Sequence, residues 1–486
     1  MDHIVYQTIL YKKQKDITTN FTTERNEIEK FIGILIYMGI NVLPSIDDYW
    51  SHITKVPHVA DVMTGKRFKL LRSSLHFNNN EDAPGSQDRF FKIRPIIDYI
   101  TNKFQQIKET PIQSIDEVMV AYKGTRAGNL RQYIKSKPDP WGFKLFCRGS
   151  SDGIIHDIIT YQGASTFETH KTKLTSEESG MNLSSKIVIC LSKTMKKPEK
   201  STVYADNFFT SLSLVEYLLN NYGCRYTGTV RDNRAGKPNL LPTSEFTKKK
   251  RGTLDYCSSE GVMALKWKDN KVVTLLSSDT GIYPMSTVNR YDKETKTKRD
   301  IPCPNVIKQY NCHMGGIDKS DMLVHLYKTP FKAHRWYMRM FGYIIDVCIT
   351  NAWLLYKRDC ASLKEQNMSL KSFRLDISQC LRGVKITENR RRTDSPNTAK
   401  QASASSPSNI VIPKKGQKRP LPPDSLRLDR SKLHGPMYTA IKSICQFCNK
   451  HGTAHRSRWI CKVCQVALCL SGDRNCYNDF HEDLSL

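Results

Sequence analysis

The C-terminal end of the chain carries the pattern that most restricts the fold, because its cysteines have the spacing of metal ligands. Cys445 and Cys448 form one C-x2-C pair, and Cys461 and Cys464 form a second pair. Each pair can chelate a metal ion from one tight turn, and four sulfur or nitrogen ligands complete the tetrahedral coordination of zinc. A segment this short has almost no hydrophobic core. We therefore predict that zinc folds residues 444–486 into a small Cys-rich zinc-binding domain.

More ligands are present here than one zinc ion needs. Cys469, Cys476 and His481 follow the two pairs and bring the number of candidate ligands to seven. We therefore predict two zinc ions, which together require eight ligands. His451 or His455 could supply the eighth, or both could be exposed histidines of a basic loop. The chain has 15 Cys, an odd number, and their clustering favours metal binding in a reducing compartment over a disulfide framework.

The charge balance indicates a polyanionic partner. Lys and Arg number 75 against 47 Asp and Glu, a formal net charge of +28, which is typical of nucleic-acid binding but also serves solubility. A hydrophobic content of 39 % excludes wholesale disorder. The apolar stretch Met340–Tyr356 contains Asp346, so no membrane span is expected. Met1 is not followed by a basic and then an apolar region, so secretion is not expected.

The N-terminal part of the chain has mostly helical patterning. Ile28, Phe31 and Leu35 recur at helical spacing, and the run Asp88–Phe104 resembles a second amphipathic helix interrupted near Pro95.

From about Ile112 the pattern becomes β-rich. The predicted strands are SIDEVMVAY, FKLFCRG, IIHDIITYQG, KIVICLS and STVYAD. The last run ends at Asp206 and is followed at once by a helical pattern, which predicts an α/β or α+β sheet domain. Residues 233–300 hold two further β-like pieces and look like an insertion, and residues 318–356 return to helical patterning.

Residues 389–443 read as a basic, Pro/Ser-rich disordered linker. They include Arg390–Arg392 and the run PKKGQKRP, and they cannot bury enough apolar surface to fold alone. The basic groups could be a nuclear localisation signal, a phosphate-binding arm or simply solvated charge.

Four aspartates occupy positions suited to metal-dependent phosphodiester chemistry, which uses carboxylates to hold divalent cations. Asp116 lies in an apolar strand, Asp206 ends another, and Asp318 follows a double glycine with Asp321 one helical turn later. Each also has an ordinary alternative role. Asp206 and Asp318 could cap helices, and Asp116 could face solvent, so the spacing alone gives only a weak indication of a metal triad.

A series of long, ordered motifs resembles the piggyBac family of transposases. The motifs are KRFKLLRSSLHFNNN (66–80), DRFFKIRP (88–95), SIDEVMVAYKG (114–124), YIKSKPDPWGFKLF (133–146), VYADNFFTSLSLVEYLL (203–219), YTGTVRDNRAGKP (226–238), MALKWKDNKVVTLLS (263–277), PNVIKQYNCHMGGIDKSDML (304–323) and HRWYMRMF (334–341). With the Cys/His tail, the resemblance covers about residues 1–380 and 444–486.

The resemblance implies an α/β architecture with an RNase H-like catalytic core and a split helical domain around it. The implied divisions are a helical dimerisation and DNA-binding domain (1–112 and 328–388), a catalytic domain (113–232 and 304–327), a β-containing insertion (233–303), the linker (389–443) and the zinc-binding domain (444–486).

The resemblance also implies the active site. Asp116, Asp206 and Asp318 match three essential aspartates of the family and would bind Mg²⁺ or Mn²⁺, while Asp321 matches an additional aspartate. The implied reaction is cut-and-paste transposition, in which nicking and hairpin formation free the element and its ends join DNA at TTAA.

Basic residues near the matching motifs are candidate DNA contacts: Arg131, Lys135, Lys137, Arg231 and Arg234, with Arg456 and Arg458 between the cysteine pairs. Arg456 and Arg458 could equally be surface charge. Trp336 could either contact DNA or pack against the protein as a residue of an amphipathic helix. The implied partners are double-stranded DNA, as element terminal repeats and TTAA target, and a second copy in a homodimer. The implied location is the nucleus.

Two functions of different class remain open. The first is an active DNA transposase, favoured because all four aspartates are present. The second is a domesticated, transposase-derived DNA-binding protein without catalytic activity. A RING- or PHD-like role for the Cys/His tail is disfavoured, because the loop between its cysteine pairs is basic rather than apolar.

Overall fold

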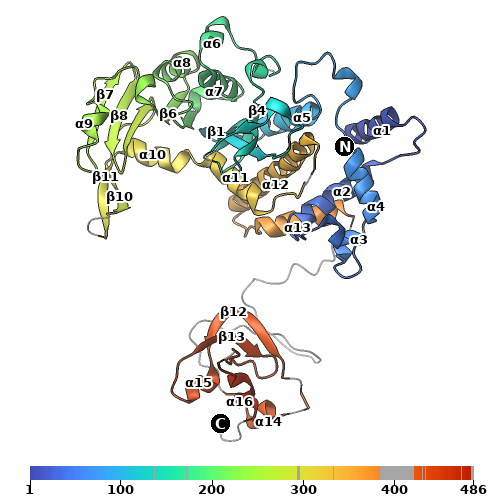
Figure 1. Cartoon of the computed structure of the whole chain (residues 1–486). Coiled ribbons are helices and arrows are strands. Elements are labelled where there is room, and N and C mark those ends of the chain that lie inside the picture. The colour runs from blue at the N-terminus through green and yellow to red at the C-terminus, as the bar shows by residue number, and fades with distance from the viewer. Residues whose placement is uncertain are drawn as a thin grey trace. The chain divides into compact units, whose positions relative to one another are not determined.

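The computed structural model describes most of the chain in two compact units, Met1–Arg392 and Thr393–Leu486, which we treat separately. The described residues are 1–135, 137–170, 172–292, 296–331, 333–383, 421–429, 431–432, 434–471 and 473–482. Figure 1 shows their helices and strands.

The first unit begins and ends in helices that share one hydrophobic core. Its N-terminal helices are α1 (Asp2–Lys15), α2 (Arg25–Met38), α3 (Pro57–Ala60), α4 (Gly65–Ser74) and α5 (Arg94–Gln105), and its C-terminal helices are α12 (Trp336–Leu363) and α13 (Leu370–Leu381). Helices α2 and α13 lie side by side (Figure 1), and the Ser378 hydroxyl donates a hydrogen bond to the carbonyl of Gly33 at 2.7 Å. Segments from opposite ends of the unit therefore pack as one helical body.

Between these helices lies a mixed nine-stranded sheet. The strands are β1 (Ile112–Ala121), β2 (Gln132–Tyr133), β3 (Trp141–Ser150), β4 (Ile155–Thr160), β5 (Thr202–Ala205), β6 (Arg225–Thr229), β7 (Leu254–Ser259), β8 (Val262–Lys268) and β9 (Val272–Ser277). Their order is β2-β3-β1-β5-β6-β9-β8-β7, with β4 also paired to β3. β1 is antiparallel to β3 and parallel to β5, and β5 is parallel to β6.

Helices cover both faces of β1, as its mostly buried sequence requires. Ile115 points into a core formed with α7 (Leu183–Lys193) and α8 (Leu212–Tyr222). Val118 and Val120 belong to the core that includes residues of α11 (Gly316–Leu326) and α12. The remaining elements of the unit are α6 (Ser176–Gly180), α9 (Thr243–Phe246), α10 (Asn305–His313) and the hairpin β10 (Ser286–Tyr291) and β11 (Lys298–Cys303).

A buried ion pair explains the charged residue within the apolar stretch of α12. Asp346 of α12 accepts a hydrogen bond from Arg374 of α13 at 2.6 Å, and both side chains are inaccessible to solvent. Burial raises the pKa of Asp346, while the Arg374 guanidinium and the Thr329 donors oppose this. In the parts of the chain that the structure describes, no helix has both the length and the apolar character needed to cross a membrane.

Two local predictions were wrong. KIVICLS forms helix α7 rather than a strand, and the Asn182 side chain accepts a hydrogen bond from the N–H of Ser185 at its start. The run Ile187–Leu191 is buried on every side, so its periodicity could not separate helix from strand. Pro95 does not interrupt α5 but lies in its first turn, where a missing N–H costs nothing.

The described residues of the second unit form two strands and three short helices. These are α14 (Asp424–Arg427), β12 (Pro436–Ile444), α15 (Gln446–Lys450), β13 (Arg456–Cys461) and α16 (Cys476–Glu482). Residues 389–420 of the predicted linker lie outside the described residues. The end of that linker differs from the prediction, because residues 436–444 pair with β13 as a strand.

Candidate active site and metal centres

Asp116 lies in the middle of β1, where its side chain is only 8 % exposed. Its pKa is raised to about 7, first by burial and then by the negative charge of Glu117, with a further contribution from Asp206. The positive charge of Lys137 opposes this shift. A buried carboxylate of this kind gains from a divalent cation, which would stabilise its ionised form.

Asp206 follows the last residue of β5, the parallel neighbour of β1. One of its carboxylate oxygens accepts a hydrogen bond from the N–H of Phe208 at 2.9 Å and so holds the turn after the strand. The N-cap of α8 is Ser211, not Asp206. The helix-capping alternative for Asp206 is therefore wrong.

Asp318 is exposed in the first turn of α11, and half-buried Asp321 lies one turn later. The N-cap of α11 is Gly315, so Asp318 does not cap this helix. The helix meets the sheet at Gly316, where a Cβ atom would lie only 2.5 Å from the carbonyl oxygen of Ser150. This close approach fixes the start of α11 against the sheet.

The charges of the three aspartates act on Tyr310 of α10. Its hydroxyl lies 3.3 Å from that of Thr229. Its pKa is raised to about 12, chiefly by burial, and the negative charges of Asp206, Asp116 and Asp318 all contribute. The charges of all three carboxylates therefore act on one half-buried tyrosine.

The carboxylates nevertheless form an open set. Among the described residues, only two Cys/His sets bring three or more candidate ligand atoms within 4.8 Å of one another. Like charges without a cation between them are expected to stand apart. Carboxylate oxygens are the donors preferred by Mg²⁺ and Mn²⁺, so this donor set fits the predicted metal.

Three basic residues border the carboxylates. Lys137 donates a hydrogen bond to the carbonyl of Glu117 at 3.3 Å, and Arg231 lies 3.4 Å from the Asn207 side chain, next to Asp206. Lys144 of β3 was missed by the sequence analysis. Burial lowers its pKa, while the charges of Glu117, Asp206 and Asp116 oppose this shift. Lys144 could have been found as the one charged residue in the apolar run from Phe143 to Cys147.

The other basic residues predicted to contact DNA in this unit lie in different settings. Lys135 is exposed. Arg234 is half-buried and donates a hydrogen bond to the carbonyl of Phe208 at 2.8 Å, which gives it a structural role. The guanidinium of Arg131 covers the ring of Trp141, with 4.2 Å between them.

Trp336 is half-buried at the start of α12 and packs against the core, as its structural alternative predicted. Its ring centroid lies 5.7 Å from that of Phe90 and 5.4 Å from that of Phe143.

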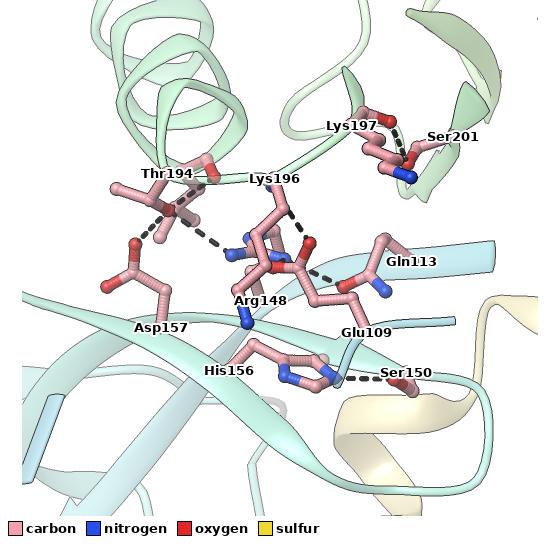
Figure 2. Close-up of polar contacts among 12 residues, drawn as sticks. Glu109, Gln113, Arg148, Ser150, His156, Asp157, Thr194, Lys196, Lys197 and Ser201 are labelled. Carbon is pink, nitrogen blue, oxygen red and sulfur yellow. Dashed lines mark hydrogen bonds and ion pairs between the residues drawn. The ribbon is translucent and has the colours of Figure 1, made fainter. Parts of the chain in front are cut away.

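A second group of ionisable side chains lies at the start of β1 and is structural (Figure 2). Fully buried Arg148 donates hydrogen bonds to Glu109 at 2.8 Å and to Gln113 at 2.9 Å. Ser150 and His156 share a hydrogen bond of 2.6 Å, and burial lowers the pKa of His156 to about 4. These groups partner one another inside the fold, so we assign them to the support of the sheet.

In the second unit, eight side chains form two sets with the geometry of zinc ligands. One set is Cys445, Cys448, Cys469 and Cys476, and the other is His434, Cys461, Cys464 and His481. Within the first set, the Cys448 sulfur lies 3.4 Å from that of Cys476 and 3.9 Å from that of Cys469. These separations fit a tetrahedron with zinc–sulfur bonds of about 2.3 Å and are far too long for disulfides, whose sulfur atoms lie about 2.05 Å apart.

The fourth ligand of the second set is His434, so the prediction of His451 or His455 was wrong. The Nδ1 atom of His434 lies 3.4 Å from the sulfurs of Cys461 and Cys464. The pairing of β12 with β13 brings His434 there, since the N–H of Lys462 donates to the carbonyl of Gly435. His451 is exposed and bonds to its own helix.

Backbone groups orient both histidines of the second set. His434 uses Nε2 to contact the carbonyl of Asp429 at 3.2 Å, and His481 uses Nδ1 to contact the carbonyl of Tyr477 at 2.7 Å. The opposite ring nitrogen of each faces the cysteine sulfurs, with 3.5 Å between His481 Nε2 and Cys464. Such contacts fix the tautomer and direction of metal-binding histidines, so these residues fit zinc.

Arg456 and Arg458 are exposed on β13. Arg458 donates a hydrogen bond to the Tyr438 hydroxyl at 2.9 Å. Both remain candidate phosphate contacts.

Comparison with known proteins identifies the family. Residues 1–353 match a family model described as Transposase IS4. The chain is 31 % identical over 358 residues to human PiggyBac transposable element-derived protein 3, and 30 % identical over 387 residues to human PiggyBac transposable element-derived protein 2. The chain belongs to the piggyBac-type transposase family. These matches cover 73 % and 78 % of the chain but only 58 % and 62 % of the two human proteins.

The piggyBac-type fold is also found among solved structures. The cryo-EM structure of a piggyBac transposase synaptic complex with hairpin DNA matches with a TM-score of 0.63 and 25 % identity. The match covers 78 % of this chain and 77 % of that one.

Proposed function

We propose that the chain is a metal-dependent DNA transposase that moves a DNA element by cutting and pasting. The observation that carries this proposal is that adjoining elements carry Asp116, Asp206 and Asp318. Ile115 of β1 pairs with Ala205 of β5, one residue before the first two aspartates, and the start of α11, with Asp318, packs on the sheet at Gly316. These aspartates come from β1, the end of β5 and the start of α11, as a catalytic triad in an RNase H-like domain would. The match to a transposase family model and to a solved piggyBac transposase supports this interpretation.

The proposed domain plan follows the sheet. The mixed core β4-β3-β1-β5-β6 is assigned to the RNase H-like catalytic domain, and β7–β11 to the insertion. The helices at both ends of the first unit, which share a core, are assigned to the split dimerisation and DNA-binding domain.

In the proposed mechanism, Asp116, Asp206 and Asp318 hold Mg²⁺ or Mn²⁺, and Asp321 is an additional acidic residue of the site. The metal supplies activation of the attacking oxygen and stabilisation of charge at the phosphate. Lys137 and Arg231 border the carboxylates and would hold the phosphate backbone of the substrate. His325 lies 3.4 Å from the Asp321 carboxylate, which raises the pKa of His325 and would help to orient Asp321.

The proposed substrate is double-stranded DNA, as element ends and a TTAA target, bound by a homodimer in the nucleus. The formal charge of +28 and the solved relative in a complex with hairpin DNA support a DNA partner. We assign the two Cys/His sets to two structural zinc ions and the unit that carries them to DNA binding.

An excision assay tests the proposed function. A reporter plasmid would carry the DNA ends that flank this gene, bordered by TTAA, and the wild-type chain is expected to remove the insert and restore the TTAA site. Absence of excision, with salt-sensitive binding of the same ends retained, would instead favour a domesticated DNA-binding protein. The names of the human relatives describe them as transposable element-derived proteins, and this is the observation that favours the domesticated alternative.

The contact of α11 with the sheet leads to a specific prediction. Gly316→Ala is expected to reduce DNA cleavage about a hundredfold, because its Cβ would overlap Ser150 and displace the start of α11 with Asp318, and a shift of about 1 Å can cost that much. Gly315→Ala is the matched control, since its Cβ would meet nothing within 4 Å. Cleavage rates would be compared at equal amounts of folded protein. Equal rates for the two variants would show that this contact does not position the site.

A further inference from the structure

The β1–β3 hairpin extends well beyond the candidate active site. β5 pairs with β1 only as far as Ile115, whereas β1 and β3 remain paired to Ala121 and Gly142. The five steps along the strand from Asp116 to Ala121 span about 17 Å at ~3.4 Å per residue. At the far end, the short strand β2 adds to the edge of β3.

Two large aromatic side chains are exposed at this far end. Tyr133 and Trp141 stand opposite each other in the β2–β3 register, with ring centroids 4.8 Å apart. Tyr133 is 54 % exposed and Trp141 is 39 % exposed. Tryptophan is usually far more buried than this, so the exposed aromatic pair calls for an explanation.

The guanidinium group of Arg131 lies beside this aromatic pair and is held in a fixed position. Arg131 lies over the Trp141 ring at 4.2 Å, and its Nη1 donates hydrogen bonds to the carbonyls of Lys123 and Gly124, both at 3.1 Å. The group is therefore held in place before any ligand arrives. A planar guanidinium and aromatic rings are the surfaces on which nucleic-acid bases stack.

The surrounding loop is strongly basic. Between β1 and β3 it contains Lys123, Arg126, Arg131, Lys135 and Lys137. Its one acidic residue, Asp139, is bound by Lys328 at 3.2 Å. Positive charge beside exposed aromatic rings matches the phosphates and bases of a nucleic-acid strand. Lys137 of this loop donates a hydrogen bond to the carbonyl of Glu117, which follows the candidate metal ligand Asp116 in β1.

We propose that Tyr133, Trp141 and Arg131 form a stacking site for an unpaired base of the DNA strand. The base must be unpaired, because the faces of a base inside a duplex are covered by its neighbours. At the duplex rise of ~3.4 Å per nucleotide, a distance of about 17 Å corresponds to about five nucleotides, and an extended single strand covers it with fewer, so the base lies at most about five nucleotides from the candidate active site. The inference rests on the proposed function for its choice of DNA as ligand.

The test compares two DNA probes of the same sequence, bound by the full-length protein without added Mg²⁺. One is a blunt duplex, and the other carries a five-nucleotide single-stranded extension. Stacking on aromatic side chains contributes about 1–3 kcal/mol per base, which corresponds to roughly 5- to 150-fold in affinity. Tyr133→Ala and Trp141→Ala are expected to weaken binding of the extended probe within this range and to change binding of the blunt duplex less than about twofold.

Control variants separate stacking from folding. Tyr99→Ala removes a tyrosine that is 61 % exposed on α5 and should leave both affinities unchanged. Tyr133→Phe and Trp141→Phe keep an aromatic face and should retain most of the preference for the extended probe. If Trp141→Ala fails to fold, Tyr133→Ala and the two Phe variants still test the stacking site.

The outcomes distinguish this inference from the proposed function. Equal losses on both probes, or no loss on either, would overturn the stacking site and leave the proposed transposase function standing. Tyr133-dependent binding of the extended probe without any binding of the blunt duplex would support the stacking site and contradict the proposed action on double-stranded ends.

Discussion

Chelation of zinc is expected to unfold the Cys/His unit while the first unit keeps its structure. The buried core of this unit consists mainly of the ligands themselves, with few apolar residues such as Val466, Leu468 and Phe480. A core this small contributes little stability of its own. The apparent free energy of structural zinc binding, about 10–16 kcal/mol, is therefore expected to be the folding energy of the unit. Metal analysis should find two zinc ions per chain, and limited proteolysis after chelation should cut after residue 420 and spare residues 1–383.

The ligand assignment has its own matched pair of variants. His434→Ala should release one zinc ion to a competing chelator far more readily than the wild type, because it removes a ligand from the second set. His451→Ala should behave as the wild type, since His451 is exposed and hydrogen-bonded to Phe447. Loss of zinc from His451→Ala but not from His434→Ala would show that His451, in the loop between the cysteine pairs, is the eighth ligand. A chelated unit that stays resistant to protease would show that zinc does not fold it.

Asp206→Asn is expected to reduce DNA cleavage at least about a hundredfold without weakening DNA binding. The change preserves the shape of the side chain but removes a negative charge and an anionic oxygen from the three candidate aspartates. The stabilisation that a metal ion contributes at a phosphate is worth several kcal/mol, and each 1.4 kcal/mol corresponds to a factor of ten in rate. Binding should persist, because the loss of a negative charge near the phosphate backbone favours DNA.

Asp279→Asn is the matched control for this prediction. This substitution also removes one carboxylate from the same unit, but the Asp279 carboxylate pairs with Arg225, at 3.2 Å. The Asp279→Asn variant should cleave DNA at a rate within a few-fold of the wild-type rate. Cleavage and excision would be measured for both variants beside equilibrium binding of the same ends. Comparable activity of Asp206→Asn and the wild type would remove Asp206 from the metal site.

Short-range patterning was enough where one signal dominated. The helical spacing of Ile28, Phe31 and Leu35 correctly predicted α2, and the β-rich, apolar run around Asp116 correctly predicted β1. It failed for α7, because a segment buried on all sides has no polar face to reveal its period. The family was also evident from sequence, because its motifs are long and ordered, and the comparisons confirmed it.

The sequence by itself determined which residue types are available: carboxylates after strands, closely spaced Cys pairs and a large basic surplus. Only the tertiary structure decided which of them meet. Asp116, Asp206 and Asp318 lie on adjoining elements because β5 pairs in parallel with β1 and α11 packs on the sheet at Gly316. His434 joins Cys461 through the pairing of β12 with β13. These contacts link residues far apart in the chain, and local propensity carries no information about such distances, which depend on strand register and close packing.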